Sequence, residues 1–353
     1  MTSDPSHQRN TLAKKRREWL ACLSGEDVHS VYQQIYAMMW DAASFHVINQ
    51  AVRVAPPVEG GGIQLSGLLY KLLYRCFFDS QMISIRRQAD SSGLTGERGV
   101  FSLAVLIRDM CDNAALFTRR QIFDAEGLAY DTVPLREAER RHAAEQHAAG
   151  EMAWFVPPDI DAGPSETRHE QIDRLAGVGR GKRSPKDRVL NTVFENLLSK
   201  LNDSCRDIKE WVDKFLAHSA TPESRRIAKA DDVEVTRGAI LNAQESICQI
   251  ASFVSVNLLG DSQLCPLAHS FFNKFQYIDR PLVAGEREVE RLRNEWFQFE
   301  QRTIPWGNWG LDDYEREFGD GDNPPAQRTC ASQNRPAARS HSKGGSDGNS
   351  PSP

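Results

Sequence analysis

One run of apolar residues at helical spacing constrains this chain most. Between residues 184 and 218 the apolar positions recur every three or four residues: Phe194, Leu198, Leu201, Cys205, Ile208, Val212 and Phe215. This period places them on one face of an α-helix, which has to be buried against other elements. Ser184 as N-cap and Pro185 at the first helical position predict where the helix begins. Thr221-Pro222 predicts that it ends near His218.

Similar periodicity extends over most of the chain. It predicts further helices over about residues 28–52, 63–89, 101–117, 136–149, 232–259 and 284–301. No segment shows the regular alternation of apolar and polar residues that is typical of a β-strand. The sequence therefore predicts an all-α fold, a bundle of long helices within residues 11–318.

Three segments lack this periodicity. Residues 1–10 are polar, and we expect them to be disordered. Residues 152–183 contain Pro-Pro, Gly-Pro and a run of glycine and basic residues, which predicts a mobile insertion in the bundle. Residues 319–353 are rich in Gly, Pro, Ser and Asn and contain no large apolar residue. Such a tail cannot bury enough surface to offset its ordering entropy, so we expect disorder there too.

Composition excludes several classes of protein. The seven cysteines are odd in number and form no Cys-x-x-Cys pair, which argues against a disulfide framework and a structural zinc site. The formal net charge is −5, so any contact with nucleic acid has to be local. No apolar run reaches the ~18 residues of a membrane span, and the N-terminus lacks an apolar signal core. We expect a cytoplasmic protein that does not enter a membrane.

Two motifs with a superficial likeness to ligand sites fail on spacing. The glycine-rich run before Ser184 has Ala176 in place of the first glycine of a phosphate-binding loop, and Arg183 in place of its Ser or Thr. His142 and His147 are five residues apart, so on a helix they diverge by about 140°. We therefore expect no metal site and no cofactor.

The long helix carries a second stripe beside its apolar face. At about 100° per residue it aligns Lys200, Ser204, Asp207, Trp211, Lys214 and His218. Such a flank is suited to line a cleft or a subunit interface. A histidine in the last turn is equally typical of a residue that caps the carbonyls of a helix end. The residue types alone leave both interpretations open.

The end of this helix resembles a known family. Residues 211–219 are similar to the C-terminal end of the signature helix of HEPN proteins (higher eukaryotes and prokaryotes nucleotide-binding). The nearest group is the family of the second protein of abortive-infection system U. Residues 85–90, 101–107 and 117–120 are also similar to that group, and the resemblance covers about Val28 to Leu259 without the insertion.

The resemblance implies a function and a site. Many HEPN proteins are metal-independent ribonucleases that work as homodimers, with an Arg and a His of one helix at the dimer cleft. His218 would be the catalytic histidine, and Lys214 is the nearest cation on the same helix. The residues that would support this pair are Asp207, Trp211, Asp213, Arg86, Arg87 and Arg119.

This chain departs from the family at the arginine. Trp211, Val212 and Asp213 occupy the positions where it should stand. Cleavage through the RNA 2′-hydroxyl needs a base and a charge that stabilises the phosphate. Lys is a point charge and serves the second role less well than the forked guanidinium of Arg, so the implied ribonuclease is a degenerate one.

Two functions from different classes follow. The first is a HEPN-like module of a bacterial defence system that associates with RNA or nucleotides. The second is a non-catalytic helical scaffold or sensor that acts through protein contacts. A polar cleft around His218 in a dimer favours the first, and a buried His218 that caps the helix favours the second.

Overall fold

The structure is a computed structural model that describes residues 5–55, 67–94, 97, 99–150, 155–217, 220–227, 235–267, 273–276 and 286–319. For residues 5–11, 67–69 and 289 only the backbone is described. Throughout these ranges the regular elements are helical, and β-pairing is limited to two isolated bridges, Gly93 with Gly99 and Thr118 with Arg188. The prediction of an all-α fold is confirmed.

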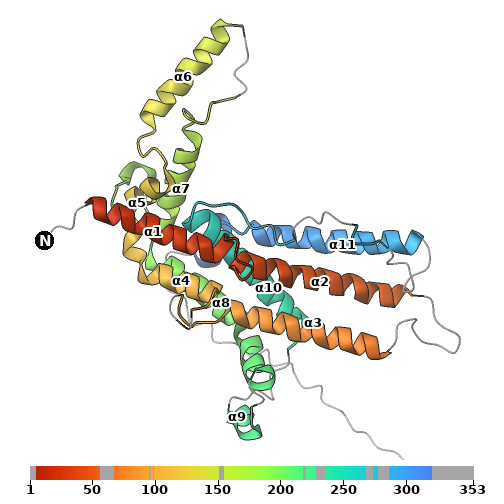
Figure 1. The fold of residues 1–353 in the computed structure, drawn as a ribbon. Helices are drawn as coiled ribbons and strands as arrows, with labels where there is room; N and C mark the ends of the chain where they lie inside the picture. The colour runs from red at the N-terminus through yellow and green to blue at the C-terminus, as the bar shows by residue number, and fades with distance from the viewer. Residues whose placement is uncertain are drawn as a thin grey trace, which may run out of the picture.

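The chain forms a bundle of long helices with shorter ones at its edges (Figure 1). The helices are α1 (Pro5–Ser24), α2 (Val31–Val54), α3 (Gly67–Gln88), α4 (Leu103–Asp112), α5 (Arg119–Glu126), α6 (Val133–Ala148), α7 (Gly163–Ala176), α8 (Asn191–Trp211), α9 (Pro222–Ile227), α10 (Arg237–Phe253), α11 (Glu286–Gly307) and α12 (Leu311–Phe318). Two π-helical turns, η3 (Val212–Leu216) and η5 (Val254–Leu258), extend α8 and α10. Short 3-10 turns are η1 (Ala114–Leu116) and η2 (Arg180–Lys182).

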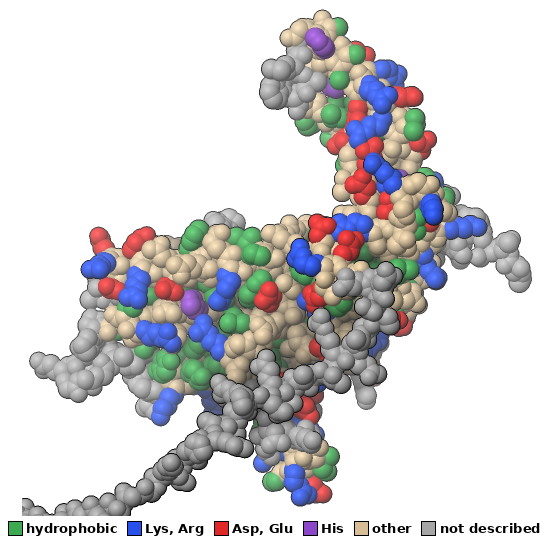
Figure 2. Space-filling model, turned by 180° about the vertical axis from the view of Figure 1, so that it is seen from behind, with side chains coloured by type: hydrophobic (Ala, Val, Ile, Leu, Met, Phe, Trp, Pro, Cys, Tyr) green, Lys and Arg blue, Asp and Glu red, His purple; other side chains and the backbone are tan. Residues whose placement is uncertain are grey.

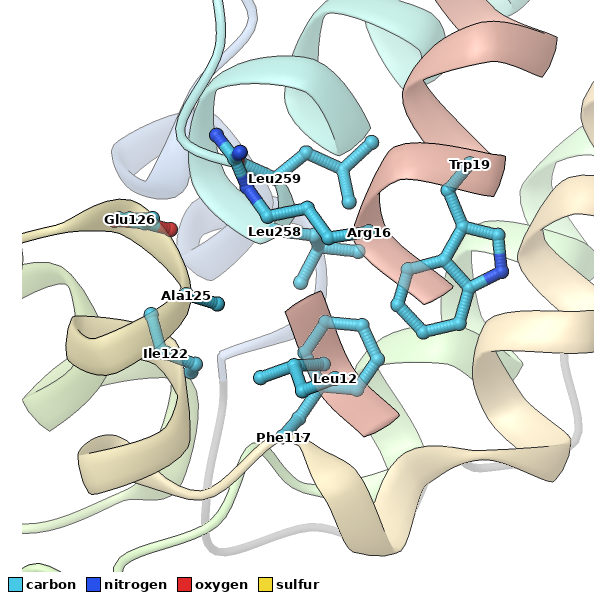
Figure 3. A pocket seen from close by; sticks show the side chains of 9 residues that line it. All are labelled: Leu12, Arg16, Trp19, Phe117, Ile122, Ala125, Glu126, Leu258 and Leu259. Carbon is cyan, nitrogen blue, oxygen red and sulfur yellow. The ribbon is translucent and has the colours of Figure 1, made fainter. Parts of the chain in front are cut away.

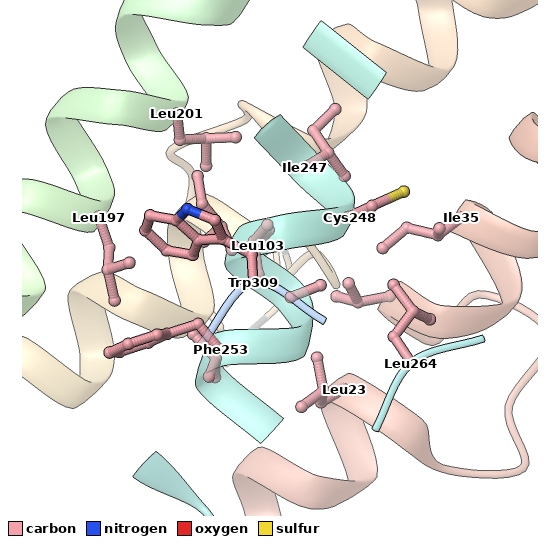
Figure 4. Packing of buried hydrophobic residues seen from close by; sticks show 14 of the residues in the cluster. Leu23, Ile35, Leu103, Leu197, Leu201, Ile247, Cys248, Phe253, Leu264 and Trp309 are labelled. Atoms are coloured by element: carbon pink, nitrogen blue, oxygen red, sulfur yellow. The ribbon is translucent and has the colours of Figure 1, made fainter. Parts of the chain in front are cut away.

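Helix α10 is the centre of the bundle. Helices α2, α3 and α11 lie side by side, and α10 packs against all three and against α8 (Figure 1). Side chains of α1, α2, α4 and α8 surround Ile247, Cys248 and Phe253 of α10 (Figure 4). Each of these three is fully buried, so the apolar stripe of α10 forms the core of the fold. None of the helices in the described part of the chain is both long and apolar enough to cross a lipid bilayer.

Most of the apolar stripe predicted for α8 is buried, with Leu198 and Phe215 half-buried, but the helix begins later. Its first residue is Asn191, and residues 184–190 instead run along the start of α5. There the amide of Arg119 donates to Asp187 O at 2.7 Å, and the amide of Val189 donates to Phe117 O at 3.1 Å. The Asp187 carboxylate accepts from the amide of Ser184 at 2.8 Å. This local turn competes with helix formation, so the predicted cap at Ser184 is wrong.

The predicted mobile insertion is partly wrong. Helix α7 occupies Gly163–Ala176, in the middle of residues 152–183. Pro164 lies in its first turn, and Gly177 ends it with φ +64°. Proline at the start and left-handed glycine at the end are helix boundary signals as well as loop signals, which explains the error.

The expectations for the two ends of the chain differ in outcome. The prediction that residues 1–10 are disordered is wrong for Pro5–Asn10, which form the first turns of α1. Residues 1–4 lie outside the described part of the chain. Most of the predicted disordered tail, residues 320–353, also lies outside it.

Helix α6 stands away from the body of the molecule (Figure 1). It confirms the polar helix predicted over residues 136–149, and none of its residues is buried. Its base is fixed by polar contacts, since Arg136 Nε donates to Glu166 Oε1 at 2.8 Å and Glu139 Oε1 accepts from the amide of Ala162 at 2.8 Å. The rest of α6 forms an arm that adds nothing to the core.

Candidate functional site

The site predicted from the family resemblance lies where α8 passes into a π-helical turn. The amide of Ala217 donates to Val212 O at 2.8 Å, five residues back. A π-turn inserts extra backbone into the helix, and such turns are frequent at functional sites. The predicted polar stripe assumes 100° per residue throughout. It therefore ends at Trp211, and Lys214 does not continue the line of Lys200.

Asp213 and Arg86 meet at this turn. Arg86 Nε donates to Asp213 Oδ1 at 3.0 Å, and Arg86 Nη1 donates to Asp90 Oδ2 at 2.6 Å. The hydrogen bond to Asp213 is the main reason why the pKa of Arg86 is raised. The structure thus brings Arg86 to the end of α8 as predicted, but with two carboxylates that neutralise its charge.

The other residues predicted for this site have different environments. Lys214 Nζ donates to Ser224 Oγ of α9 at 2.9 Å. Trp211 is half-buried and stacks on Phe215 with 5.1 Å between ring centroids. Asp207 and Arg87 are exposed. His218 lies outside the described residues.

Arg119 is placed in a different part of the molecule. Its side chain is fully buried, and Nη2 donates to Asp173 Oδ1 of α7 at 2.7 Å. Nε donates to Asp187 Oδ2 at 3.0 Å, and Nη1 donates to His169 O at 3.0 Å. Because all these partners belong to α7 and residues 183–187, Arg119 holds α7 to the body and does not join the end of α8.

Sequence reasoning missed a group of cations that meets between α2, α10 and α11. Arg53 lies in the last turn of α2, Arg237 is the first residue of α10, and Arg302 lies on α11. We call these three residues the arginine cluster. Burial and the charges of Arg302 and Arg53 lower the pKa of Arg237. An arginine with a lowered pKa is still charged at neutral pH, so three positive charges share this surface.

His46 of α2 lies inside the arginine cluster. Arg237 Nη2 donates to His46 Nδ1 at 3.0 Å, and His46 Nε2 lies 3.4 Å from Glu295 Oε2. Burial and the charge of Arg237 lower the pKa of His46, which keeps the ring neutral and able to accept this bond. The ring stacks on Phe299, with 5.4 Å between centroids, and the guanidinium of Arg302 lies over Phe299 at 4.9 Å.

In the described part of the chain, no arginine of the cluster is paired directly with a carboxylate, and the nearby Glu295 lies against His46 instead. Among the described residues no carboxylate lies within ion-pairing distance of Arg53, Arg237 or Arg302. Arg53 and Arg302 are exposed and Arg237 is half-buried. Figure 2 shows several Lys and Arg side chains, with some Asp and Glu side chains among them, beside hydrophobic ones on the end of the body that lies opposite the α6 arm. Unpaired guanidinium groups at close range repel one another, and a bound anion would remove that repulsion.

The sequence held no signal for the arginine cluster. Its members come from three helices, and the first is far from the other two along the chain. None of them belongs to a motif with a fixed spacing. Only the packing of α10 and α11 on α2 brings them together.

Comparison with known proteins gives no assignment. No family model matches the chain, and no curated protein or solved structure matches it either. What the protein binds has to follow from the chemistry of its own side chains.

Neither the cavity described next nor the metal-ligating side chains of the described residues offer a second ligand site. A small, mostly apolar cavity lies between α1, α5 and the end of η5, lined among others by Trp19, Phe117 and Leu258 (Figure 3). The polar side chains at its edge are already paired, since Arg16 Nε donates to Leu259 O at 2.8 Å and Glu126 accepts from Arg168. In the described ranges, no three His, Cys, Asp or Glu side chains lie where they could share a metal ion.

Proposed function

We propose that this chain is a helical module that binds RNA or nucleotides, and that the arginine cluster takes their phosphate groups. One observation carries the proposal. Arg237 is half-buried between two like charges, and its guanidinium donates to a neutral histidine instead of a carboxylate. Planar guanidinium groups bind phosphate in a bidentate way, so such a group is suited to a phosphate oxygen. The net charge of −5 makes a local site of this kind necessary.

The arginine cluster is better suited to this role than the end of α8. A phosphate at Arg86 would have to displace Asp213 and Asp90, which lie 3.0 and 2.6 Å from its guanidinium nitrogens. At Arg53, Arg237 and Arg302 no described carboxylate has to leave first. The desolvation cost of binding is therefore lower at the arginine cluster.

The resemblance to HEPN proteins supports the same class of ligand. It adds a homodimer and a role in bacterial defence to the proposal. It also keeps a degenerate ribonuclease as a hypothesis, with His218 as the base and Lys214 as the cation. Binding and cleavage would depend on different residues of the chain.

Fluorescence anisotropy of a short labelled RNA tests the binding. Arg237→Gln should weaken binding by about ten- to a hundredfold, because a hydrogen bond between charged groups contributes roughly 1.5–3 kcal/mol. The slope of log affinity against log salt should fall by about 0.7 for each lost contact to a single strand. Arg206→Gln is the matched control, because Arg206 is an exposed arginine of α8 that is already paired with Asp203. Absence of binding to wild type at low salt, or equal losses in both variants, would refute the proposal.

The second candidate, a scaffold or sensor that acts through protein contacts, is favoured by the α6 arm. A helix with no buried residue that projects from the body is available to a partner. Arg140→Glu together with Arg141→Glu should disrupt a contact made by the arm and leave RNA binding unchanged. Loss of RNA binding in this double variant would instead place the nucleic acid on α6.

A further inference from the structure

We infer that the nucleic acid bound at the arginine cluster is single-stranded, because α3 presents a row of aromatic rings beside the cluster on which bases can stack. This inference rests on the proposed function and names its ligand class. The row consists of Tyr70, Tyr74 and Phe78, and we call it the aromatic row.

The aromatic row follows one face of α3. Its residues are four apart, so each ring lies about one turn from the next. Ring centroids are 6.3 Å apart between Tyr70 and Tyr74 and 4.5 Å apart between Tyr74 and Phe78. The rings thus form a continuous surface along the first half of the helix.

A second layer of rings packs against the aromatic row. Phe45 of α2 lies edge-on to Tyr74 at 6.0 Å and stacks on Phe77 of α3 at 4.0 Å. Tyr70 Oη donates to Asn49 Oδ1 of α2 at 3.0 Å, which fixes the orientation of that ring. Because the orientation of these rings is set before binding, little side-chain entropy is lost when a ligand covers them.

Tyr74 is the most exposed ring of the aromatic row. It is 47% exposed, whereas Tyr70 and Phe78 are half-buried. Leu72 and Cys76 are also exposed, but each is two residues from Tyr74 and points about 160° away from it around the helix, so they belong to another face. The stacking surface of the row is therefore centred on Tyr74.

The aromatic row and the arginine cluster belong to one surface. Both contact the same turn of α2, where Arg237 Nη2 donates to His46 Nδ1 at 3.0 Å and the ring of the preceding residue, Phe45, lies 6.0 Å from that of Tyr74. Figure 2 shows hydrophobic side chains next to Lys and Arg side chains on this end of the body. Cations that track a phosphate backbone, next to rings that stack on its bases, are the usual combination in proteins that bind single strands.

The combination discriminates between ligands. A duplex keeps its base faces inside the stack, so it offers phosphates to the arginine cluster and nothing to the aromatic row. A single strand offers both. If this surface instead bound an anionic membrane or a second copy of the chain, the protein would not distinguish an RNA strand with bases from one without them.

The test compares single-stranded RNA, a duplex of the same sequence, an abasic strand and inorganic polyphosphate, each by anisotropy or competition. Wild type should bind the single strand about tenfold tighter than the duplex or the abasic strand. Tyr74→Leu should lower single-strand affinity to the duplex level, and Tyr74→Phe, which keeps the ring, should restore it. Phe155→Leu is the matched control, since Phe155 is an exposed ring outside the row. Thermal melting of each variant checks that the fold is retained.

The outcomes separate the two claims. If wild type binds neither RNA nor polyphosphate, the proposed function fails and this inference fails with it. If wild type binds duplex, abasic strand and single strand equally, the arginine cluster works without the aromatic row, and the inference alone is overturned. Loss of single-strand preference in Tyr74→Phe as well as in Tyr74→Leu also overturns it, because the hydroxyl and not the ring would then be the determinant.

Discussion

Arg168 of α7 and Glu126 of α5 form a two-pronged ion pair that is almost completely buried. Arg168 Nη2 donates to Glu126 Oε1 at 2.6 Å and Nε donates to Oε2 at 2.9 Å. The two side chains are 4% and 8% exposed. Arg168 Nη1 also donates to Asn257 O at 2.7 Å, so one side chain joins α7 and α5 to the end of the central helix.

This pair predicts a large loss of stability when one partner is removed. Arg168→Leu leaves the Glu126 carboxylate buried without its counter-charge, and we expect the free energy of unfolding to fall by about 3–5 kcal/mol. The double variant Arg168→Leu with Glu126→Leu should recover much of that loss, because no charge is then buried. Urea unfolding of the three proteins measures both values. A single variant as stable as wild type would show that the pair is solvated.

Gly260 predicts a smaller loss for two separate reasons. Its φ is +57°, and a Cβ there would lie 2.6 Å from Glu126 Oε1. Gly260→Ala therefore adds backbone strain of about 1–2 kcal/mol and also disturbs the Arg168–Glu126 pair. Gly127→Ala is the control, since Gly127 has φ +71° and no atom within 4 Å of the added Cβ. Melting temperatures should fall further for Gly260→Ala, and equal values would mean that the pair yields without cost.

From the environment of His169, we predict that the free energy of unfolding falls as the pH drops below neutral. Burial and the nearby Arg119 charge lower the pKa of His169. Arg119 Nη1 lies 3.2 Å from His169 Nδ1 and can only donate, so Nδ1 accepts and the proton sits on Nε2, which faces Tyr130 O at 2.9 Å. The unfolded histidine takes up a proton near pH 6.5 and the folded one only at lower pH. This contribution to stability is complete above about pH 6.5 and is lost as the pH falls below it.

The measurement for His169 is a difference between two proteins. The free energy of unfolding of wild type should decline between about pH 7.5 and 5, and that of His169→Gln should decline less. The comparison is needed because His46, whose pKa is also lowered, titrates in the same direction. Parallel pH profiles for the two proteins would contradict the prediction.

Leu201 tests the core itself. It is fully buried on α8 and faces the side chains around α10 (Figure 4). Leu201→Ala leaves a cavity and should lower the free energy of unfolding by about 2–5 kcal/mol. Leu198→Ala is a useful comparison, because Leu198 is only half-buried and should cost less. A loss below about 1 kcal/mol for Leu201→Ala would mean that this part of the core is loosely packed.

The ribonuclease hypothesis has its own test. We expect wild type to leave a mixed RNA pool intact, because the arginine expected by family resemblance is absent and Arg86 is neutralised by Asp213 and Asp90. Cleavage by wild type that His218→Ala lowers by about 10²–10⁴ would contradict this and establish the HEPN chemistry. Lys214→Arg should then raise the activity, because a guanidinium binds phosphate in a bidentate way.

Sequence periodicity predicted the helices whose apolar faces are wide and regular. The stripe of α8 is an example, since Phe194, Leu201 and Ile208 are all buried. It failed for α7, where most of the buried side chains, among them His169 and Asp173, are polar and only Ile172 and Leu175 are apolar. A pattern built on apolar spacing cannot detect a helix that is held by ion pairs and hydrogen bonds.

Less of the candidate site than of the fold could be predicted from the sequence. Arg86 lies at the end of α8, but its pairing with Asp213 depends on a π-turn that no 3.6-residue period anticipates. The arginine cluster depends on which helix faces meet. Periodicity reports which face of a helix is apolar, and it does not report which other helix covers it.

The α6 arm should be locally less stable than the body of the molecule. Because no residue of α6 is buried, its backbone amides are protected only by the helix itself, and a single helix of this length is marginal in water. In hydrogen–deuterium exchange its amides should exchange long before those of α10. The arm can fray and re-form while the body stays folded, so the turn at Ala149–Gly150 is a place where the chain should tolerate an inserted reporter domain.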